Sequence, residues 1–351
     1  MKVARLYRFN DIRIEEVPVP GIGPRDALVR TKACGICSGD VMPWYIEKKA
    51  PLVLGHEPVG EIIELGKELM ARRHSTPSAQ HLPQIGDRVF VHHHAPCMSC
   101  RYCRKGHHVQ CETWRSTGIF PGGISEYMLV SEINLRNDTL LLSEEINDED
   151  GTLIEPAACV VKSFKRAQIE EGDTILVIGL GVMGQMHVLL AREFGAGTVI
   201  GADRVPFRLK KALEFGADHV IDVSQEDLSE RVRTLTEGVM ADIVIVGPNS
   251  ADAMRQGAEV AARGGKVILF TPAKPGEKLG IDPNLLYFRD IMLVSSYSCG
   301  PADTAAALRI IRAGHVTAEK LVTHRFPLEK TSEAFALTAE ARDSLKSVIV
   351  F

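Results

Sequence analysis

The feature that most constrains the fold is a set of three glycines between a strand-like segment and a helical one. Thr174–Ile178 is mostly apolar, Gly179, Gly181 and Gly184 follow, and Gln185–Phe194 has a helical pattern. Gly179 permits a tight turn, Gly181 lets backbone N–H groups approach a phosphate at the helix N-terminus, and Gly184 allows close helix–strand packing. The spacing predicts a dinucleotide-binding turn, with Val182 and Met183 inside it.

The end of the next predicted strand supports this interpretation. Thr198–Ala202 is followed by Asp203, about 20 residues beyond the glycines, as a dinucleotide-binding motif requires. A carboxylate there accepts hydrogen bonds from a ribose diol and repels a 2′-phosphate, so NAD(H) is favoured over NADP(H). The alternative is that Asp203 only caps its strand and that the glycines form an ordinary turn.

The rest of the chain divides into two patterns. Short strand-like runs separated by Gly and Pro predict a mostly antiparallel β domain up to about residue 130: Ala27–Ala33, Gly60–Leu65, Arg88–His92 and Ser125–Val130. Apolar segments that alternate with helical patterns then predict a doubly wound parallel sheet: Thr174–Ile178, Thr198–Ala202, His219–Val223, Asp242–Val246, Lys266–Phe270 and Ile291–Ser295. Further predictions are a surface loop at Lys67–Gln84, a helix at Asp303–Ala313 and a terminal strand at Ser347–Phe351.

Composition excludes several classes of protein. The 351 residues suffice for two domains, and 45% hydrophobic with 25% charged residues is typical of a folded globular chain. The net charge of −4, without a basic block, argues against nucleic acid as a partner. We find no export signal in Met1–Asn10 and no membrane span, so we expect a cytoplasmic protein whose cysteines are thiols or metal ligands.

Four closely spaced cysteines predict a metal site. Cys97, Cys100, Cys103 and Cys111 can place four thiolates around one tetrahedral Zn²⁺. A closed four-thiolate site leaves no open coordination position, so its zinc should be structural. An iron–sulfur cluster is the main alternative, but the chain shows no other electron-transfer feature.

A second group of metal-ligand residues lies nearer the N-terminus. Cys37 occurs in the sequence Cys-Gly-Ile-Cys-Ser-Gly-Asp, and His56 occurs in Gly-His-Glu-Pro. A thiolate, an imidazole and a carboxylate together suit a catalytic zinc with an open position. Spacing alone does not identify the carboxylate, and the alternative is a buried thiol with an unrelated surface histidine.

These motifs together resemble those of the zinc-dependent medium-chain alcohol and polyol dehydrogenases. Cys-Gly-Ile-Cys, Gly-His-Glu, the four-cysteine segment, Ile-Glu-Pro at residues 154–156 and Gly-Leu-Gly-Val-Met-Gly occur in the order of that family and cover nearly the whole chain. The resemblance implies an α/β protein with a GroES-like, mostly β catalytic domain and a Rossmann cofactor domain. The catalytic domain would comprise residues 1–156 and 298–351, with the structural zinc lobe at about 97–111, and the NAD-binding domain would comprise residues 157–297.

The resemblance also assigns roles to individual residues. It implies that Cys37, His56 and Glu155 hold the catalytic zinc, and that Glu57 can enter or leave the coordination sphere. Asp40 would orient the zinc-bound His56. With the four-cysteine site this gives two zinc ions per chain. Glu155 followed by proline is similar to the sorbitol and threonine dehydrogenase branches.

In the cofactor domain, the resemblance gives Asp203 the NAD-selecting role and places Arg208 near the adenosine ribose. The other cysteines, Cys34, Cys159 and Cys299, match no ligand position, and we interpret them as buried thiols.

One departure from the family concerns the proton path. The family usually has Ser or Thr two residues after the catalytic Cys, but this chain has Gly39, preceded by Ser38. Either Ser38 takes a related role or, as we favour, a water chain or another side chain moves the alcohol proton. The residues His92, His93 and His94 border the expected substrate cleft and could relay protons or bind a polar substrate, although outward-facing, inactive histidines are the simpler interpretation. Trp114 and Arg115 are expected in a loop, where Arg115 could bind a carboxylate or phosphate.

The sequence thus predicts a zinc-dependent oxidoreductase that transfers a hydride between NAD(H) and a secondary alcohol, polyol or sugar-derived hydroxyl compound. Two alternatives are a zinc enzyme of the same fold that uses tightly bound NAD for dismutation or lyase-type chemistry, and a non-catalytic member of the family. The partner is expected to be a small molecule, and the family precedent is a homodimer or homotetramer.

Overall fold

The computed structural model describes residues 1–70 and 83–351 and divides the chain into two compact units. Unit 1 comprises Met1–Ala158 and Cys299–Phe351, and unit 2 comprises Cys159–Ser298. Of the loop expected at Lys67–Gln84, residues 71–82 lie outside the described residues, and residues 67–70 are helical. Within the described ranges, no helix combines the length and the apolar character needed to cross a membrane.

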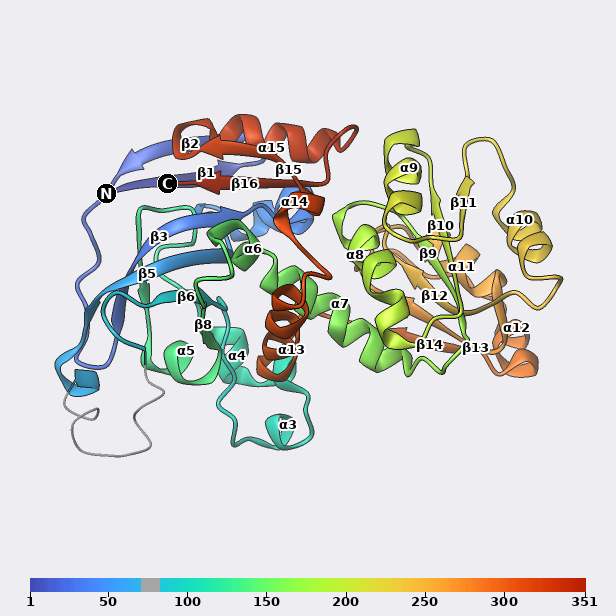
Figure 1. Cartoon of the computed structure of the whole chain (residues 1–351), viewed down its shortest axis with the longest axis horizontal. Coiled ribbons are helices and arrows are strands. Elements are labelled where there is room, and N and C mark those ends of the chain that lie inside the picture. The colour runs from blue at the N-terminus through green and yellow to red at the C-terminus, as the bar shows by residue number, and fades with distance from the viewer. Residues whose placement is uncertain (71–82) are drawn as a thin grey trace. The chain divides into compact units, whose positions relative to one another are not determined.

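Unit 1 is built on a seven-stranded sheet that is mainly antiparallel (Figure 1). The strand order is β15-β16-β3-β5-β6-β8, and β7 also pairs with β3. These strands are β3 (Ala27–Gly35), β5 (Glu57–Leu65), β6 (Arg88–Val91), β7 (Tyr127–Val130), β8 (Thr139–Leu141), β15 (Val322–Pro327) and β16 (Lys346–Val350). A smaller sheet has the order β2-β1-β4 and contains β1 (Lys2–Arg8), β2 (Asp11–Glu16) and β4 (Leu52–Val53).

Short helices connect the strands of unit 1 and carry several site residues. They are α1 (Pro43–Ile46), α3 (Arg101–Arg104), α4 (Glu112–Ser116), α5 (Glu132–Asn137), α6 (Asp148–Thr152), α13 (Pro301–Arg312), α14 (Ala318–Leu321) and α15 (Thr331–Glu340). The longer α7 (Ile154–Ala167) begins in unit 1 and ends in unit 2.

Unit 2 is a six-stranded parallel sheet with the order β11-β10-β9-β12-β13-β14. The order reverses at β9, which confirms the doubly wound sheet expected from the sequence. The strands are β9 (Thr174–Ile178), β10 (Thr198–Asp203), β11 (His219–Asp222), β12 (Ala241–Val246), β13 (Ala261–Leu269) and β14 (Met292–Ser295). Its helices are α8 (Val182–Ala191), α9 (Pro206–Glu214), α10 (Leu228–Leu235), α11 (Ala251–Glu259) and α12 (Pro283–Arg289).

The last strand of the chain completes the sheet of unit 1. β16 pairs antiparallel with β3, with Ile349 opposite Cys34, and parallel with β15. In Figure 1 this places a red C-terminal strand among blue N-terminal ones. On its other side β3 pairs with β5, with Gly35 opposite Glu57. The pairing therefore brings the ends of β3, β5 and β16 together from distant parts of the sequence.

Candidate functional site

The first candidate metal set lies where β3 ends and β5 begins. Cys37 follows β3 as the N-cap of a 3₁₀ helix, and His56 directly precedes β5. Because Gly35 faces Glu57 across the two strands, the turns after β3 and before β5 are neighbours. One ligand atom each from Cys37, His56 and Glu57 lies within 4.8 Å of the other two. A thiolate, an imidazole and a carboxylate at this separation fit a zinc ion.

Two contacts orient the ligands of this set. The carboxylate Oδ2 of Asp40 lies 3.2 Å from Nδ1 of His56, which leaves Nε2 for a metal. The backbone N–H of Gly39 donates to Sγ of Cys37 over 3.3 Å. Burial lowers the pKa of His56, but the negative charges of Asp40 and Cys37 outweigh it and raise the pKa well above the ordinary value. The site therefore has the negative potential that favours a bound cation.

Glu57 also forms a buried ion pair with Lys346. Nζ of Lys346, on β16, contacts the carboxylate of Glu57 and also donates to the backbone carbonyl of Ile36 over 2.9 Å. Both side chains are only 1% exposed. Burial lowers the pKa of Lys346, but the charges of Glu57 and Cys37 raise it above the ordinary value. The pKa of Glu57 is raised, mainly by burial. No local sequence signal indicated Lys346, because its partner is 289 positions away.

Glu155 belongs to a different set. It lies in the first turn of α7 and is 6% exposed, and its ligand atom lies within 4.8 Å of those of His92 and Cys299. Glu155 nevertheless raises the pKa of both Glu57 and Lys346 through its charge, so the two sets are electrostatic neighbours. The sequence grouped Glu155 with Cys37 and His56 and gave Cys299 no role beyond that of a buried thiol.

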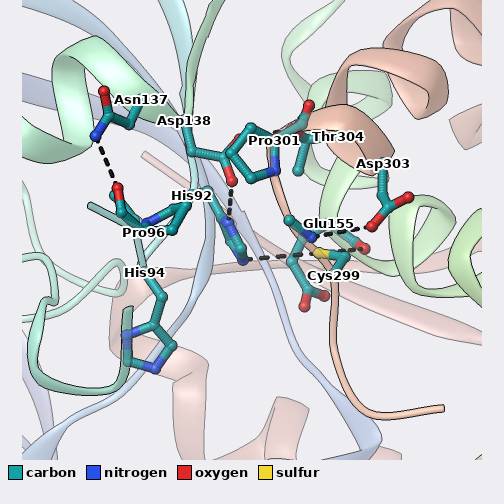
Figure 2. Close-up of polar contacts among 12 residues, drawn as sticks. His92, His94, Pro96, Asn137, Asp138, Glu155, Cys299, Pro301, Asp303 and Thr304 are labelled. Carbon is teal, nitrogen blue, oxygen red and sulfur yellow. Dashed lines mark hydrogen bonds and ion pairs between the residues drawn. The ribbon is translucent and has the colours of Figure 1, made fainter. Parts of the chain in front are cut away.

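His92 is at the centre of a buried network of contacts (Figure 2). Its Nδ1 lies 2.6 Å from Oδ2 of Asp138, and its Nε2 lies 3.7 Å from Sγ of Cys299. The hydroxyl of Thr304 donates to the other oxygen of Asp138 over 2.5 Å. Burial lowers the pKa of His92, whereas Cys299 and Asp138 raise it well above the ordinary value. The sequence gave no signal for Asp138 and Thr304, which come from separate segments.

The two following histidines differ from His92. Nδ1 of His93 is buried and has no hydrogen-bond partner among the described residues, and its ring centroid lies 4.9 Å from that of His56. Nδ1 of His94 bonds to the carbonyl oxygen of Thr117 over 2.6 Å. Burial lowers the pKa of both rings, well below the ordinary value for His93 and to about 4 for His94. His92 is buried and His93 and His94 are partly buried, so none of the three faces solvent fully in the way the simpler interpretation expected.

The four cysteines of the expected structural site come together in unit 1. Their sulfur atoms all lie within 4.8 Å of one another, and Sγ of Cys103 is 3.5 Å from that of Cys100 and 3.9 Å from that of Cys97. Hydrogen bonds from Ser99 and from the backbone lower the pKa of Cys97 to about 5, which favours the thiolate. The expected loop at Trp114 and Arg115 is wrong. Both residues lie in helix α4, which buries Trp114 against the cysteines and leaves Arg115 exposed.

Cys34 and Cys159, which we expected to be buried thiols, differ from each other in burial. Cys34 is fully buried, as expected, and burial raises its pKa to about 12. Cys159 is only partly buried. Ser38 is exposed.

The glycine turn of unit 2 has the expected geometry. Gly179 follows β9 with a φ of +86°, a conformation that favours glycine. A Cβ on Gly184 would lie 2.0 Å from the carbonyl oxygen of Gly179, so only glycine lets α8 pack this closely. A Cβ on Gly181 would meet no atom within 4 Å, which leaves open space in front of the α8 N-terminus. Val182 and Met183 form the first turn of that helix.

Asp203 holds the turn from the end of β10. Its Oδ2 accepts the N–H of Leu180 over 2.6 Å, and its Oδ1 accepts the N–H of Arg204 over 2.7 Å. Nη1 of Arg208 lies 3.5 Å from the same carboxylate. The capping contacts of the simpler interpretation are therefore present, and they fix the carboxylate at the end of β10.

Comparison with known proteins identifies the family. Residues 23–137 match the model of the alcohol dehydrogenase GroES-like domain, and residues 182–313 match that of the zinc-binding dehydrogenases. A sorbitol dehydrogenase of Bombyx mori is 30% identical over 360 residues, which cover 99% of this chain and 97% of that protein. The chain belongs to the zinc-dependent medium-chain alcohol and polyol dehydrogenases. It is therefore an oxidoreductase of the zinc-binding class, as the sequence motifs implied.

Two further relatives agree with this assignment. An L-threonine 3-dehydrogenase of Rhizobium etli strain CIAT 652 is 30% identical over 331 residues, covering 92% of this chain and 90% of the relative. A solved structure of a zinc-binding dehydrogenase of Sinorhizobium meliloti 1021, bound to NADP, superposes with a TM-score of 0.87 at 27% identity. The superposition covers 100% of this chain and 99% of the other. The combination of a GroES-like domain and a Rossmann sheet is thus confirmed.

Proposed function

We propose that this dehydrogenase transfers a hydride between NAD(H) and a small polyol or a related secondary alcohol. The observation that carries the proposal is the set of Cys37, His56 and Glu57, with Asp40 behind the histidine. The names of the relatives, which include sorbitol and erythritol/L-threitol dehydrogenases, support a polyol as the substrate. Unit 1 would be the catalytic domain and unit 2 the cofactor domain.

For the catalytic metal we keep the ligands that the family resemblance implies. Cys37 and His56 would hold the ion, with the carboxylate of Glu155 as third ligand and that of Glu57 able to exchange with it. Lys346 competes for Glu57, because its ammonium group already contacts that carboxylate. A zinc ion held there would supply Lewis-acid chemistry at the substrate oxygen, and a nicotinamide cofactor would supply the hydride acceptor.

Because Gly39 replaces the family's usual Ser or Thr, another residue would contact the substrate hydroxyl. A Cβ on Gly39 would lie 3.5 Å from Sγ of Cys37, an ordinary contact, so crowding does not force glycine at this position. His93 supplies a buried Nδ1 that has no partner among the described residues, and its ring lies beside that of His56. We propose that Nδ1 of His93 hydrogen-bonds the substrate hydroxyl, whose binding would satisfy an otherwise costly buried polar atom.

The choice of cofactor rests on Asp203. Its carboxylate is fixed by the backbone N–H groups of Leu180 and Arg204 and remains 8% exposed. A fixed negative charge at the end of β10 repels a 2′-phosphate and accepts hydrogen bonds from a ribose diol, which favours NAD. Arg208 would lie near the same ribose, since it contacts the Asp203 carboxylate.

The four-cysteine set would hold the second zinc. It offers four sulfur atoms within 4.8 Å of one another and no other ligand type, which suits a closed structural site. This would give the chain one catalytic and one structural zinc in the sets foreseen from the sequence. Because such a cluster requires reduced thiols, a cytoplasmic location is also proposed.

The sheet edge of unit 2 supports a homodimer as the assembly unit. β14 is an edge strand whose Met292 is 47% exposed, and the nearby Tyr287 and Phe288 are 77% and 74% exposed. Edge strands with exposed apolar side chains pair readily with a second copy. A homotetramer could form from two such dimers.

The test is reduction of NAD⁺ by the zinc-replete chain with polyols, primary alcohols, sugar acids and amino alcohols, repeated with NADP⁺ and after chelation. We expect turnover of polyols with NAD⁺ that is lost on chelation and in Cys37→Ala. Cys34→Ala is the matched control, because Cys34 is a buried thiol of the same unit outside every candidate metal set among the described residues. No turnover of any alcohol, with zinc and NAD bound, would contradict the proposal.

A further inference from the structure

Unit 1 contains a second group of metal-ligand side chains that matches the first in composition. Each group has a cysteine, a histidine and a glutamate, and in each an aspartate contacts Nδ1 of the histidine. The first group is Cys37, His56, Glu57 and Asp40, and the second is Cys299, His92, Glu155 and Asp138. We propose that the second group is a further binding position for a zinc-type divalent cation.

The distances within the second group fit such an ion. For Zn–N bonds of about 2.0 Å and Zn–S bonds of about 2.3 Å, tetrahedral geometry separates the two ligand atoms by about 3.5 Å. Nε2 of His92 lies 3.7 Å from Sγ of Cys299, and the ligand atom of Glu155 lies within 4.8 Å of both. The ligand atoms therefore need little movement to bind an ion.

The contacts behind His92 fix the ring in the orientation that a metal ligand requires. Asp138 lies 2.6 Å from Nδ1 and is itself held by the hydroxyl of Thr304, so the Nδ1–H donates and Nε2 faces Cys299 (Figure 2). A carboxylate on the far nitrogen of a histidine is a common support for bound zinc. The side chain of Asn134 donates to the carbonyl oxygen of His92 over 3.0 Å, which also fixes the backbone there.

All four side chains of the second group are buried, which favours the binding of a cation. His92 and Cys299 are 0% exposed, and Asp138 and Glu155 are 2% and 6% exposed. Buried charged groups are costly unless they are paired or bind a metal, and this group gathers two carboxylates and a thiol around one imidazole. A divalent cation would balance that charge, and on binding the thiol of Cys299 would lose its proton to solvent. A thiol, an imidazole and a carboxylate favour zinc over magnesium or calcium.

The two positions share one carboxylate in this interpretation. We have proposed Glu155 as a ligand of the first ion, and the structure groups it with His92 and Cys299. A carboxylate has two oxygens, so Glu155 can serve either position or bridge both. A cation at the second position would therefore bind in addition to the proposed catalytic zinc. The catalytic zinc would keep Cys37 and His56 as its ligands.

The experiment measures zinc content of the full chain by mass spectrometry of the metal after zinc saturation and gel filtration. The variants are Cys37→Ser, Cys299→Ser and the double variant, with Cys34→Ser as matched control for a buried thiol. We expect the double variant to hold one zinc equivalent less than Cys37→Ser, and Cys34→Ser to match the wild type. Equal zinc content in Cys37→Ser and in the double variant would overturn the proposal.

Two further measurements keep the result interpretable. Circular dichroism melting must show that each variant is folded, and Cys299→Ala replaces Cys299→Ser if the latter is not. The proposed catalytic role of Cys37 is tested separately, because it fails if Cys37→Ser keeps both the wild-type zinc content and the wild-type turnover. Loss of zinc on Cys299 substitution is expected whether or not the chain turns over a polyol.

Discussion

Acidification should weaken unit 2 through His187, a side chain of the helix that follows the glycine turn. His187 is 1% exposed, and its ring packs against those of Phe164 and Phe270 at centroid distances of 5.1 and 4.8 Å. Its Nδ1–H donates to the carbonyl oxygen of Met183 over 2.8 Å, and its Nε2 lies 2.7 Å from the hydroxyl of Ser163. Burial lowers its pKa from 6.5 to about 4.

The sign of the effect follows from proton uptake. In the folded chain His187 stays neutral down to about pH 4, whereas in the unfolded chain it gains a proton below about pH 6.5. Between these values the unfolded state binds more protons, so the stabilisation is fully present above pH 6.5 and is lost as the pH falls. Between pH 7 and pH 5 the loss in free energy of unfolding is about 2 kcal/mol.

Hydrogen exchange of the β9 amides measures this effect at the two pH values, after correction for intrinsic exchange rates. Tryptophan fluorescence does not serve, because both tryptophans, Trp44 and Trp114, lie in unit 1. The opening free energy of β9 should fall by about 2 kcal/mol more in the wild type than in His187→Gln. An equal fall in the two proteins would refute the reasoning, whatever the stability of the variant at pH 7.

Two other predictions follow from buried charges. Lys346→Met leaves Glu57 without its ammonium partner, so we expect unit 1 to lose about 3–5 kcal/mol in urea unfolding followed by tryptophan fluorescence. Adding Glu57→Gln should restore part of this loss, and a double variant as unstable as the single one would contradict the explanation. Asp203→Asn removes the charge at the end of β10, so the ratio of kcat/KM for NADP⁺ to that for NAD⁺ should rise about tenfold, equivalent to about 1.4 kcal/mol. An unchanged ratio would mean that Asp203 only caps the turn.

The strands of unit 2 were largely predictable because buried parallel strands are continuous apolar runs. β9 has the predicted bounds, and β10 extends the prediction only to Asp203. β13 begins at Ala261, five residues before the predicted Lys266, because the strand continues through Gly264 and Gly265 with a register shift against β12. Glycine weakens a strand without excluding it when the neighbouring strand is buried.

Strands of unit 1 were harder to predict where they lie at sheet edges. β2 has the sequence Asp-Ile-Arg-Ile-Glu-Glu, and β15 contains His324, Arg325 and Pro327. Polar side chains and proline are typical of exposed edges and hide the strand pattern. β7 begins at Tyr127 instead of Ser125, which forms only an isolated bridge with Val3.

The sequence predicted the metal-ligand residue types but not all of their partners. The four cysteines come together as expected because they lie within 15 positions of one another. Asp138 meets Thr304 across 166 positions, and His92 meets Cys299 across 207. Such contacts depend on the pairing of whole elements, and one sequence carries no local pattern for them.

Unit 1 is formed by two segments of the chain, which are synthesised before and after unit 2. Unit 2 is one continuous segment, Cys159–Ser298, so it can fold as soon as that segment leaves the ribosome. At that point unit 1 still lacks Cys299, Thr304 and β16, which carries Lys346. A chain released early would thus have a complete parallel sheet in unit 2, whereas in unit 1 β3 would lack its partner β16 and Glu57 would lack its partner Lys346. Completion of the unit 1 sheet and of the Glu57–Lys346 ion pair therefore depends on the segment after unit 2, residues 299–351.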